Sequence, residues 1–570
     1  MIKLLFTLLA FALCICSVAQ TANRYDVVIT EIMADPTPQV GLPNAEYIEL
    51  KNVSSAAFNL NGWRISDATS TATITANFVL QPDSFVILCA NSNAAAFSVF
   101  GRTIGVTSFP SLDNDGDQLT LRSPQNRIIH ALAYTIEWYA NAAKKDGGWS
   151  LEMIDPKNPC SGKANWKAST NNLGGTPGKG NSVNGTNPDQ TPPQLKRAYA
   201  LDSVTVVLVF DEPLDSLSAS ATTNYAANGL TIASATPIAP LFNSVQLKLS
   251  SPLQRATVYN LSVTNVTDCK GNPVGSFNTT KIGLAEDAAT NDVVINEILF
   301  NPRPGAEDYV ELYNRSNRIV DASKLYIANR NSSGVVSSLK KLSEQPFPIF
   351  PGDYIVITED AVNLSMQYLV KYTDVVLTLS SLPSYPDDKG IVVLLTLNGD
   401  IVDEVAYNKD WHFALIANAE GVALERIDPD GASQNKNNWH SAASTAGYGT
   451  PGYQNSQYKQ VNSSKATIEL SSKTFSPDGD GIDDVLLIQY SIEQRGYVAN
   501  IIVFDASGRE VRRLVKNDLL GLKGNWKWDG LSEKGLKLPV GTYVIYTELF
   551  NLQGKKETFK NTVVLARRFN

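Results

Sequence analysis

An alternating run of Asp and Gly near the C-terminus has the residue types of a calcium site. Carboxylate oxygens are the hard ligands that calcium prefers, and the glycines between them permit the tight turns that let carboxylates converge on one cation. The run lacks the Glu that ends a twelve-residue EF-hand loop, because Gln489 stands at that position counted from Asp478. Two interpretations therefore stay open, a calcium site or a plain turn into the next strand. The candidate calcium ligands are Asp478, Asp480, Asp483 and Asp484.

Two pairs of glutamates could take part in acid–base chemistry, which commonly uses paired carboxylates. Glu31 with Glu49 is one pair, and Glu297 with Glu311 is the other. In the strand expected from Val27 to Met33, Glu31 shares a face with Val27 and Ile29. Because the pair occurs twice, and one enzyme rarely needs the same half-site twice, we expect these carboxylates to be hydrogen-bonded at strand ends or to hold a turn. We predict no catalytic residue.

Histidine sites and the common catalytic motifs have little support. The chain has three His, and His412 and His440, which each follow a Trp, are the candidates for a shared metal. The sequence contains no Gly-x-Ser-x-Gly elbow and no phosphate-binding P-loop. We therefore predict no cofactor other than calcium.

Several folded cores must position these residues. The chain has 570 residues, of which 43% are hydrophobic and 18% charged, a composition typical of several globular domains rather than of a disordered chain. The formal charge of −8 argues against nucleic acid as a partner, since phosphate binding needs a basic face.

One long segment occurs twice in the chain. The matched stretches, in the same order each time, are residues 27–36 with 293–302, 46–52 with 308–314, 151–156 with 424–429, and 175–178 with 449–452. Two copies of one domain explain this order. We call residues 24–183 the first copy and residues 291–456 the second copy.

Both copies consist of short runs rich in Val, Ile and Tyr, separated by turns of Gly, Pro, Asn and Asp. This pattern is typical of β-strands and continues through the rest of the chain. The predicted fold class is all-β, with four tandem immunoglobulin-like β-sandwich domains after a signal peptide.

Tryptophans in the copies permit a second kind of site, an aromatic platform for sugars. Four of them recur between the copies, which favours packing in a core. The recurring pairs are Trp138 with Trp411 and Trp166 with Trp439. Trp63 and Trp149 are less constrained and are the candidates for a sugar-binding surface.

Residues 24–183 and 291–456 resemble the lamin-tail domain. The resemblance rests on an opening Ile-x-Glu-Ile, a Tyr-Ile/Val-Glu-Leu strand, Gly62-Trp63 in the first copy, and a closing Gly-Thr-Pro-Gly. It implies an immunoglobulin-like β-sandwich of a kind often found in secreted bacterial proteins, with a role in binding or spacing rather than catalysis. The second copy departs from the pattern because it lacks the Gly-Trp.

The remaining segments resemble two other families. Residues 191–284, which we call the middle segment, resemble the bacterial immunoglobulin-like domains of surface-layer and adhesin-type proteins, which implies a spacer. The C-terminal unit, residues 465–570, contains Ser-Pro-Asp-Gly-Asp-Gly from Ser476 and Trp528-Asp529-Gly530. It resembles the C-terminal sorting domains of the Bacteroidetes type IX secretion system, including the gliding-motility-associated kind, and the related fold of the flagellar hook-capping protein. This resemblance implies recognition by the type IX secretion machinery.

The N-terminus predicts export as well. Residues 1–20 combine Lys3, an apolar run from Leu4 to Cys16 and small residues, which is the pattern of a secretory signal peptide. No later run is long enough for a transmembrane helix, so we expect no transmembrane segment after signal removal.

Three cysteines follow residue 20, namely Cys89, Cys160 and Cys269. An odd number cannot all pair within the chain. Cys89 and Cys160 fall in the same copy, so either these two pair or Cys89 is a buried thiol of a strand.

Together these features predict an exported, non-enzymatic protein of the cell surface or extracellular space, with a role in adhesion or structural display. Its expected partners are the type IX machinery and a surface protein or polysaccharide ligand, with no nucleic acid. The alternative is a secreted hydrolase or a carbohydrate-binding accessory protein.

Overall fold

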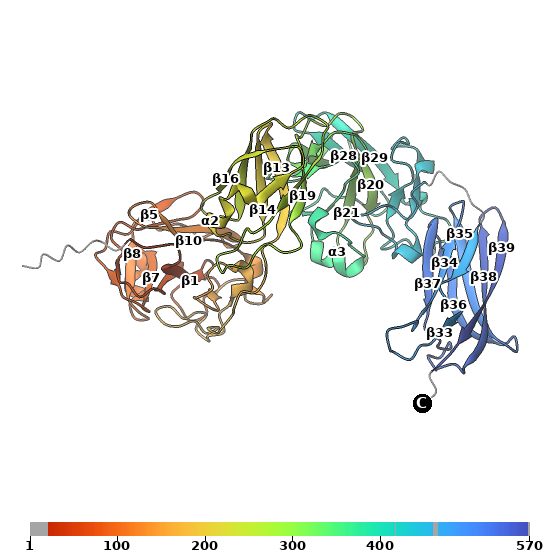
Figure 1. Cartoon of the computed structure of the whole chain (residues 1–570), viewed down its shortest axis with the longest axis horizontal. Helices are drawn as coiled ribbons and strands as arrows, with labels where there is room; N and C mark the ends of the chain where they lie inside the picture. Colours follow the sequence, from red (N-terminus) through yellow and green to blue (C-terminus); the bar gives the residue numbers. More distant parts are fainter. Residues whose placement is uncertain (1–20, 417, 460–465, 568–570) are drawn as a thin grey trace, which may run out of the picture. The chain divides into compact units, whose positions relative to one another are not determined.

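The computed structural model describes residues 21–416, 418–459 and 466–567. The signal peptide expected at residues 1–20 lies outside the described residues. Strands dominate, joined by turns and short helices (Figure 1), so the all-β prediction is confirmed. Contacts divide the described residues into two compact units: those up to residue 252 together with 259–282, and 253–258 together with those from residue 283 onward. Within the described residues, no helix has the length and apolar character to cross a membrane.

The first copy is a sandwich of two sheets. The larger sheet has six strands in the order β12 (Trp166–Ala168), β11 (Leu151–Met153), β1 (Val27–Met33), β2 (Tyr47–Asn52), β7 (Phe85–Ala90) and β8 (Thr103–Val106). The smaller has the order β10 (Ile128–Thr135), β9 (Gly116–Arg122), β4 (Arg64–Ser66) and β5 (Thr71–Thr73). Alternation along β2 sends Ile48 and Leu50 into the core between the sheets, while Tyr47 packs on the other face against Phe97.

The second copy repeats this arrangement. Its six-stranded sheet has the order β31 (Trp439–Ser441), β30 (Leu424–Arg426), β20 (Val293–Leu299), β21 (Tyr309–Asn314), β26 (Tyr354–Thr358) and β27 (Val376–Thr378). Its four-stranded sheet has the order β29 (Ile401–Asn408), β28 (Lys389–Thr396), β23 (Leu325–Arg330) and β24 (Val336–Lys341). The repeat seen in the sequence is therefore a repeat of topology, strand by strand.

The other segments also form paired sheets. The middle segment has sheets of β13 (Leu195–Asp202), β14 (Thr205–Phe210), β17 (Ser244–Leu249) and β16 (Ile232–Pro237), and of β15 (Tyr225–Ala227), β18 (Tyr259–Val263) and β19 (Thr279–Ile282). The C-terminal unit has sheets of β32 (Thr467–Leu470), β34 (Leu486–Ser491) and β37 (Lys523–Trp528), and of β33 (Thr474–Phe475), β39 (Lys556–Leu565), β38 (Gly541–Asn551), β35 (Tyr497–Asp505) and β36 (Glu510–Leu519).

The cysteine pairing differs from one of the two expectations. Cys160 forms a disulfide with Cys269 of the middle segment, so a Cys89–Cys160 bond is wrong. Cys89 is a free, fully buried thiol of β7 that packs beside Phe97, as its other interpretation predicted. Burial raises the pKa of the Cys89 thiol to about 11, which keeps it uncharged and unreactive.

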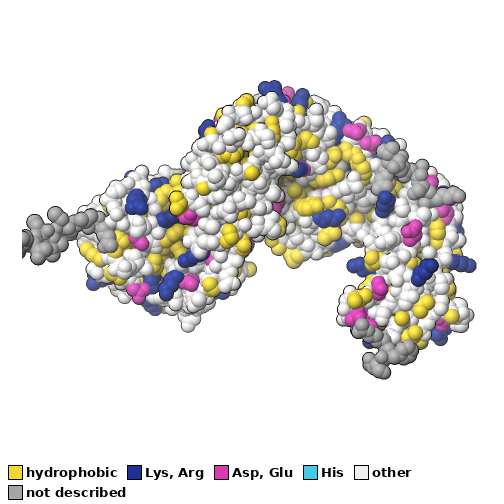
Figure 2. All heavy atoms as spheres, in the orientation of Figure 1, with side chains coloured by type: hydrophobic (Ala, Val, Ile, Leu, Met, Phe, Trp, Pro, Cys, Tyr) yellow, Lys and Arg dark blue, Asp and Glu magenta, His cyan; other side chains and the backbone are white. Residues whose placement is uncertain are grey.

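Both signs of charge occur on the face of the molecule that Figure 2 draws. On the face drawn in Figure 2, basic and acidic side chains are interspersed, without a continuous basic area on that face.

Candidate functional site

A β-bulge turns the first candidate glutamate away from the core. The register between β1 and β2 shifts between Ile29 and Glu31, which moves Glu31 to the opposite face from Ile29. The expectation that the two residues share a face is therefore wrong. The same shift occurs between Ile295 and Glu297 of β20.

The bulge places three carboxylates side by side on neighbouring strands. Glu31 lies opposite Glu49 of β2 and opposite Glu152 of β11, and all three are fully buried. We call this set the carboxylate row of the first copy. The row of the second copy consists of Glu297, Glu311 and Glu425 in the same register.

The closing segment of the first copy, residues 174–183, covers this row. The backbone N–H of Thr176 donates to Glu31 Oε1 over 2.7 Å, and the N–H of Gly178 donates to Glu49 Oε2 over 2.7 Å. The Thr176 hydroxyl donates to Glu152 Oε1 over 2.8 Å. Tyr47 adds a hydrogen bond of 2.6 Å from its hydroxyl to Glu31. The Gly-Thr-Pro-Gly motif is thus the part of the chain that the carboxylates hold.

The second copy repeats these contacts with its closing segment, residues 448–457. Thr450 N–H donates to Glu297 Oε1 over 2.9 Å, and Gly452 N–H donates to Glu311 Oε2 over 2.6 Å. Glu425 accepts from the hydroxyl of Ser456 over 2.9 Å, as Glu152 accepts from Ser182 over 2.7 Å in the first copy.

The rows retain protons at neutral pH. Burial, and secondarily the neighbouring Glu152, raises the pKa of Glu31 to about 7. Burial and Glu425 raise that of Glu297 to about 8. The geometry agrees, because the Thr450 hydroxyl lies 2.8 Å from Glu297 Oε2 and 2.9 Å from Glu425 Oε1. A hydroxyl carries one hydrogen and can donate it to only one of these two carboxyls. The other carboxyl makes a hydrogen bond with the hydroxyl oxygen when it carries a proton of its own.

The carboxylate rows have a geometry that suits a structural role. Their side chains are fully buried, and hydroxyl and N–H donors of the protein occupy their oxygens. A substrate could reach none of these six carboxyls without removing the closing segment. The sequence identified Glu31, Glu49, Glu297 and Glu311, but missed Glu152 and Glu425, although the repeated Leu-Glu-x-Ile-Asp-Pro contains both.

The candidate histidines His412 and His440 contact other side chains of the second copy. The His412 Nδ1 lies 2.9 Å from the Ser441 hydroxyl, and its ring packs on Phe300 with centroids 5.5 Å apart. His440 packs against Phe413 with centroids 5.3 Å apart. Burial lowers the pKa of His412 to about 4.

The tryptophans largely belong to the cores. Trp138 and Trp166 pack together at 5.8 Å between ring centroids, and Trp411 and Trp439 do so at 6.3 Å. Trp63 is only 3% exposed, so it cannot form a sugar platform. Trp149 is half-buried, with the Lys144 ammonium 4.0 Å from its ring centroid.

The C-terminal acidic loop brings three of its four predicted ligands together. Carboxylate oxygens of Asp478, Asp480 and Asp484 lie within 4.8 Å of one another. Asp483 is not in this group, and its backbone carbonyl accepts from Ser476 N–H.

Internal hydrogen bonds also explain the composition of this loop. The carboxylate of Asp484 accepts the backbone N–H of Gly479 over 2.6 Å and that of Gly481 over 2.8 Å. These two bonds lower the pKa of Asp484. Calcium at this loop stays a prediction.

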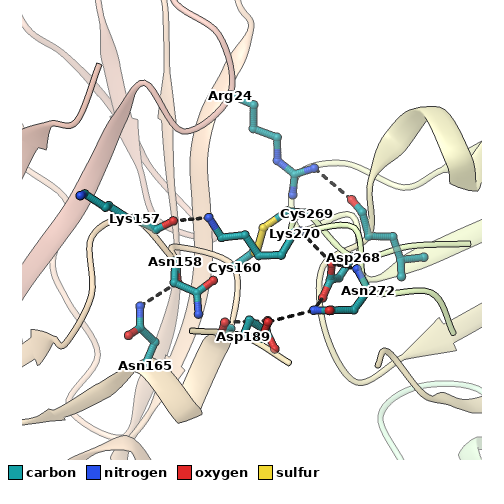
Figure 3. The surroundings of a disulfide bond; sticks show 12 residues. Arg24, Lys157, Asn158, Cys160, Asn165, Asp189, Asp268, Cys269, Lys270 and Asn272 are labelled. Carbon is teal, nitrogen blue, oxygen red and sulfur yellow. Dashed lines mark hydrogen bonds between the residues drawn. A yellow bond between two sulfur atoms is a disulfide. The ribbon is translucent and has the colours of Figure 1, made fainter. Parts of the chain in front are cut away.

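A disulfide joins the first copy to the middle segment (Figure 3). Around Cys160–Cys269, the Lys270 ammonium donates to the Lys157 carbonyl, and Asn272 donates to the Asp189 carbonyl over 3.3 Å. Sequence reasoning missed this bond because it grouped cysteines by domain.

Three carboxylates gather near the disulfide. Oxygens of Asp189, Glu212 and Asp268 lie within 4.8 Å of one another. Burial, followed by the charges of Asp189 and Asp268, raises the pKa of Glu212 to about 8, so this group is readily protonated near neutral pH.

Two family models match parts of the chain. Residues 20–135 and 286–409 match the Lamin Tail Domain, and residues 468–565 match the CHU_C Type IX secretion signal domain. No curated protein matches the chain.

Three solved structures show weak likeness to parts of this chain. The N-terminal part of the bacterial S-layer protein SbsC is 15% identical with a TM-score of 0.17, covering 29% of this chain and 40% of that one. A DUF4876 family protein from Bacteroides thetaiotaomicron is 12% identical with a TM-score of 0.18, covering 32% of this chain and 77% of that one. Latent PorU from Porphyromonas gingivalis is 9% identical with a TM-score of 0.14, covering 80% and 41%. Similarity at this level assigns neither fold nor function.

Proposed function

Because this chain carries two lamin tail domains ahead of a type IX secretion signal domain, we propose that it is a non-enzymatic protein of adhesion or structural display. The secretion signal indicates export to the cell surface or the extracellular space. The type IX machinery is the partner that this signal implies. A surface protein or polysaccharide is the ligand that we propose for the exported part.

The carboxylate rows carry the non-enzymatic part of the proposal. A hydrolase that uses paired carboxyls for acid–base chemistry needs carboxyls that a substrate and water can reach. Here the six glutamates that pair across strands are fully buried and bind the closing segments in both copies. That use is the same in each copy, which supports a structural role.

The Cys160–Cys269 disulfide supports the export part. Disulfides form and persist in oxidising compartments and are rare in the cytosol. This one joins residues 109 positions apart, so it forms after both segments have been made.

The domain plan that accompanies this function is a proposal too. It consists of a signal peptide at 1–20, lamin-tail domains at 24–183 and 291–456, an immunoglobulin-like spacer at 191–284 and a sorting domain at 465–570.

Cell fractionation tests the export route. In a bacterium with a type IX system, the intact chain is compared with a chain lacking residues 465–570 and with a control chain lacking residues 24–183. We expect the intact and control chains on the surface or in the medium, and the chain without the C-terminal unit in the periplasm. Equal export of all three would contradict a sorting role.

Binding and hydrolysis assays on the exported full chain test the function itself. We expect it to bind isolated cell-surface polysaccharide or outer-membrane protein without releasing reducing ends, peptides or nucleotides. Steady product release that follows the purified chain would contradict the non-enzymatic proposal, and an absence of any binding would leave display as its role.

A further inference from the structure

The second copy and the C-terminal unit share an apolar contact. Phe413 of the second copy clusters with Val498 and Leu519 of the C-terminal unit, and Ile416 and Phe550 pack against this cluster. Phe413 is 9% exposed, Val498 1% and Leu519 3%. An aromatic side chain that is buried at the centre of such a contact is the usual anchor of a protein–protein interface.

Hydrogen bonds surround this anchor. The Ser444 hydroxyl donates to the Leu519 carbonyl over 2.8 Å, and the hydroxyls of Thr445 and Tyr490 lie 2.7 Å apart. The Arg495 Nε donates to the Gln457 carbonyl over 2.7 Å. These bonds fix one orientation of the two surfaces.

Two further bonds come directly from the closing segment. Gln457 Nε2 donates to the Leu520 carbonyl over 3.2 Å, and Leu522 N–H donates to the Ser456 carbonyl over 3.3 Å. The side of the second copy that makes these contacts is called the docking face, and it consists of Phe413, Ser444, Thr445, Ser456 and Gln457.

The carboxylate row holds the docking face in place. Glu425 accepts from the Ser456 hydroxyl and from the Gln457 N–H, the latter over 2.8 Å. The same two residues therefore bind the buried row on one side and the C-terminal unit on the other. A surface fixed in its binding conformation loses less entropy on association.

The first copy has different residues at the matching positions. When Trp138 is aligned with Trp411, Ala140 falls at the position of Phe413. When the two closing segments are aligned at their row-binding serines, Val183 falls at the position of Gln457. The docking face is thus a property of the second copy rather than of the repeat.

We propose that the docking face binds the C-terminal unit strongly enough to retain it after the chain between them is cut. The bound partner is residues 466–567 of the same chain. Release of the C-terminal unit would then take two steps, cleavage of the backbone and separation of the docked surfaces. This inference does not depend on adhesion or on the absence of catalysis.

The direct test cuts the full chain and asks whether the pieces separate. A recognition sequence for a specific protease is inserted between Lys459 and Ala466, the purified chain is cut, and the products are run on a sizing column at micromolar concentration. We expect the two pieces to elute together. Elution as two separate species would overturn the proposal.

Variants locate the contact. Phe413→Glu introduces a charge into the apolar cluster, and we expect the dissociation constant of the cut pieces to rise at least about tenfold. Leu415→Glu is the matched control, because Leu415 is 46% exposed in the same loop, and we expect no change. Equal affinity of the two variants would overturn the assignment of the face.

A milder variant covers the case in which Phe413→Glu unfolds. Gln457→Val gives the docking face the residue of the first copy and keeps the backbone N–H that Glu425 binds. We expect faster separation of the cut pieces, with unchanged protection of residues 448–457 from hydrogen exchange. Unchanged separation would contradict the proposal.

Discussion

The two lamin tail copies agree in their carboxylate rows and differ in how each contacts the next part of the chain. The first copy is fixed covalently, through Cys160–Cys269, to the middle segment. The second contacts the C-terminal unit through Phe413 and hydrogen bonds. The same type of domain thus makes a covalent junction in one place and a non-covalent one in another.

The two copies also differ in the side chain that accepts a backbone N–H of the strand before the bulge. His130 Nδ1 accepts the Ile29 N–H over 2.9 Å in the first copy, whereas Asp403 accepts the Ile295 N–H over 2.8 Å in the second. The Arg426 guanidinium donates to Asp403 over 2.9 Å. The first copy has Met153 at the position of Arg426, so two neutral side chains of the first copy stand where the second copy has an ion pair.

The largest effect is expected from breaking this ion pair. Arg426→Met leaves Asp403 buried without its counter-charge and should destabilise the second copy by about 3–5 kcal/mol. Adding Asp403→His recreates the neutral pair of the first copy and should restore most of that loss. Denaturant unfolding, followed in the second copy, measures both. If the double variant is no more stable than the single one, the two pairs are not equivalent.

The covalent junction should respond to reduction. Removing the disulfide with Cys160→Ser should destabilise the first unit by roughly 2–4 kcal/mol, and reductant should then have no further effect. Cys89→Ala is the control, since Cys89 is a free thiol, and this variant should keep its sensitivity to reductant. Thermal unfolding of the two variants, with and without reductant, measures which of them has lost the sensitivity to reductant. Loss of that sensitivity in Cys89→Ala would point to a Cys89 disulfide.

The bridging hydroxyls test whether the rows are equivalent. Thr176→Val and Thr450→Val each remove a hydroxyl from two buried carboxyls, and each should cost about 1–3 kcal/mol. Hydrogen exchange should increase only in the closing segment of the altered copy. A large loss in one copy and none in the other would break the comparison.

The rows also predict a dependence on pH. Both Glu31 and Glu297 have folded pKa values above the ordinary 4.5, so the folded state binds the proton more tightly than the unfolded one. Their stability contribution is complete below about 4.5 and is lost as pH rises through the folded pKa, by up to roughly 1.4 kcal/mol per pH unit for each group.

The two copies should differ in where this loss ends. The part of this loss that is due to Glu31 should end near pH 7, and the part that is due to Glu297 near pH 8, following their pKa values of about 7 and about 8. Glu49 and Glu311, whose pKa values burial also raises, continue to titrate. Unfolding measured across this range, with Glu31→Gln and Glu297→Gln as variants that remove one titration each, checks the sign. Stability that rises with pH in this window would contradict it.

The sequence predicted much of this architecture because the repeated motifs contact one another in the folded domain. The glutamate of Ile-x-Glu-Ile accepts the N–H of the closing Thr176, and a contact of that kind preserves both motifs and their order. The bulge that turns Glu31 to the opposite face from Ile29 left no local signal, because the residues of this strand have the pattern of a regular strand.

Other features depended on contacts between distant segments. Glu152 joins the row only because β11 pairs with β1. Ser150 of the same network hydrogen-bonds to Glu31, from which 119 residues of chain separate it. Cys160 reaches Cys269 only because the middle segment packs beside the first copy. Neither spacing nor composition encodes such a neighbour.

Hydrogen exchange of the closing segments tests the central claim most directly. Buried carboxylates bind residues 174–183 of the first copy and residues 448–457 of the second copy in the same way. We expect both segments to be protected in the full chain, with Glu49→Ala exposing only the first and Glu311→Ala only the second. Rapid exchange of both segments in the unaltered chain, or no response to either variant, would contradict it.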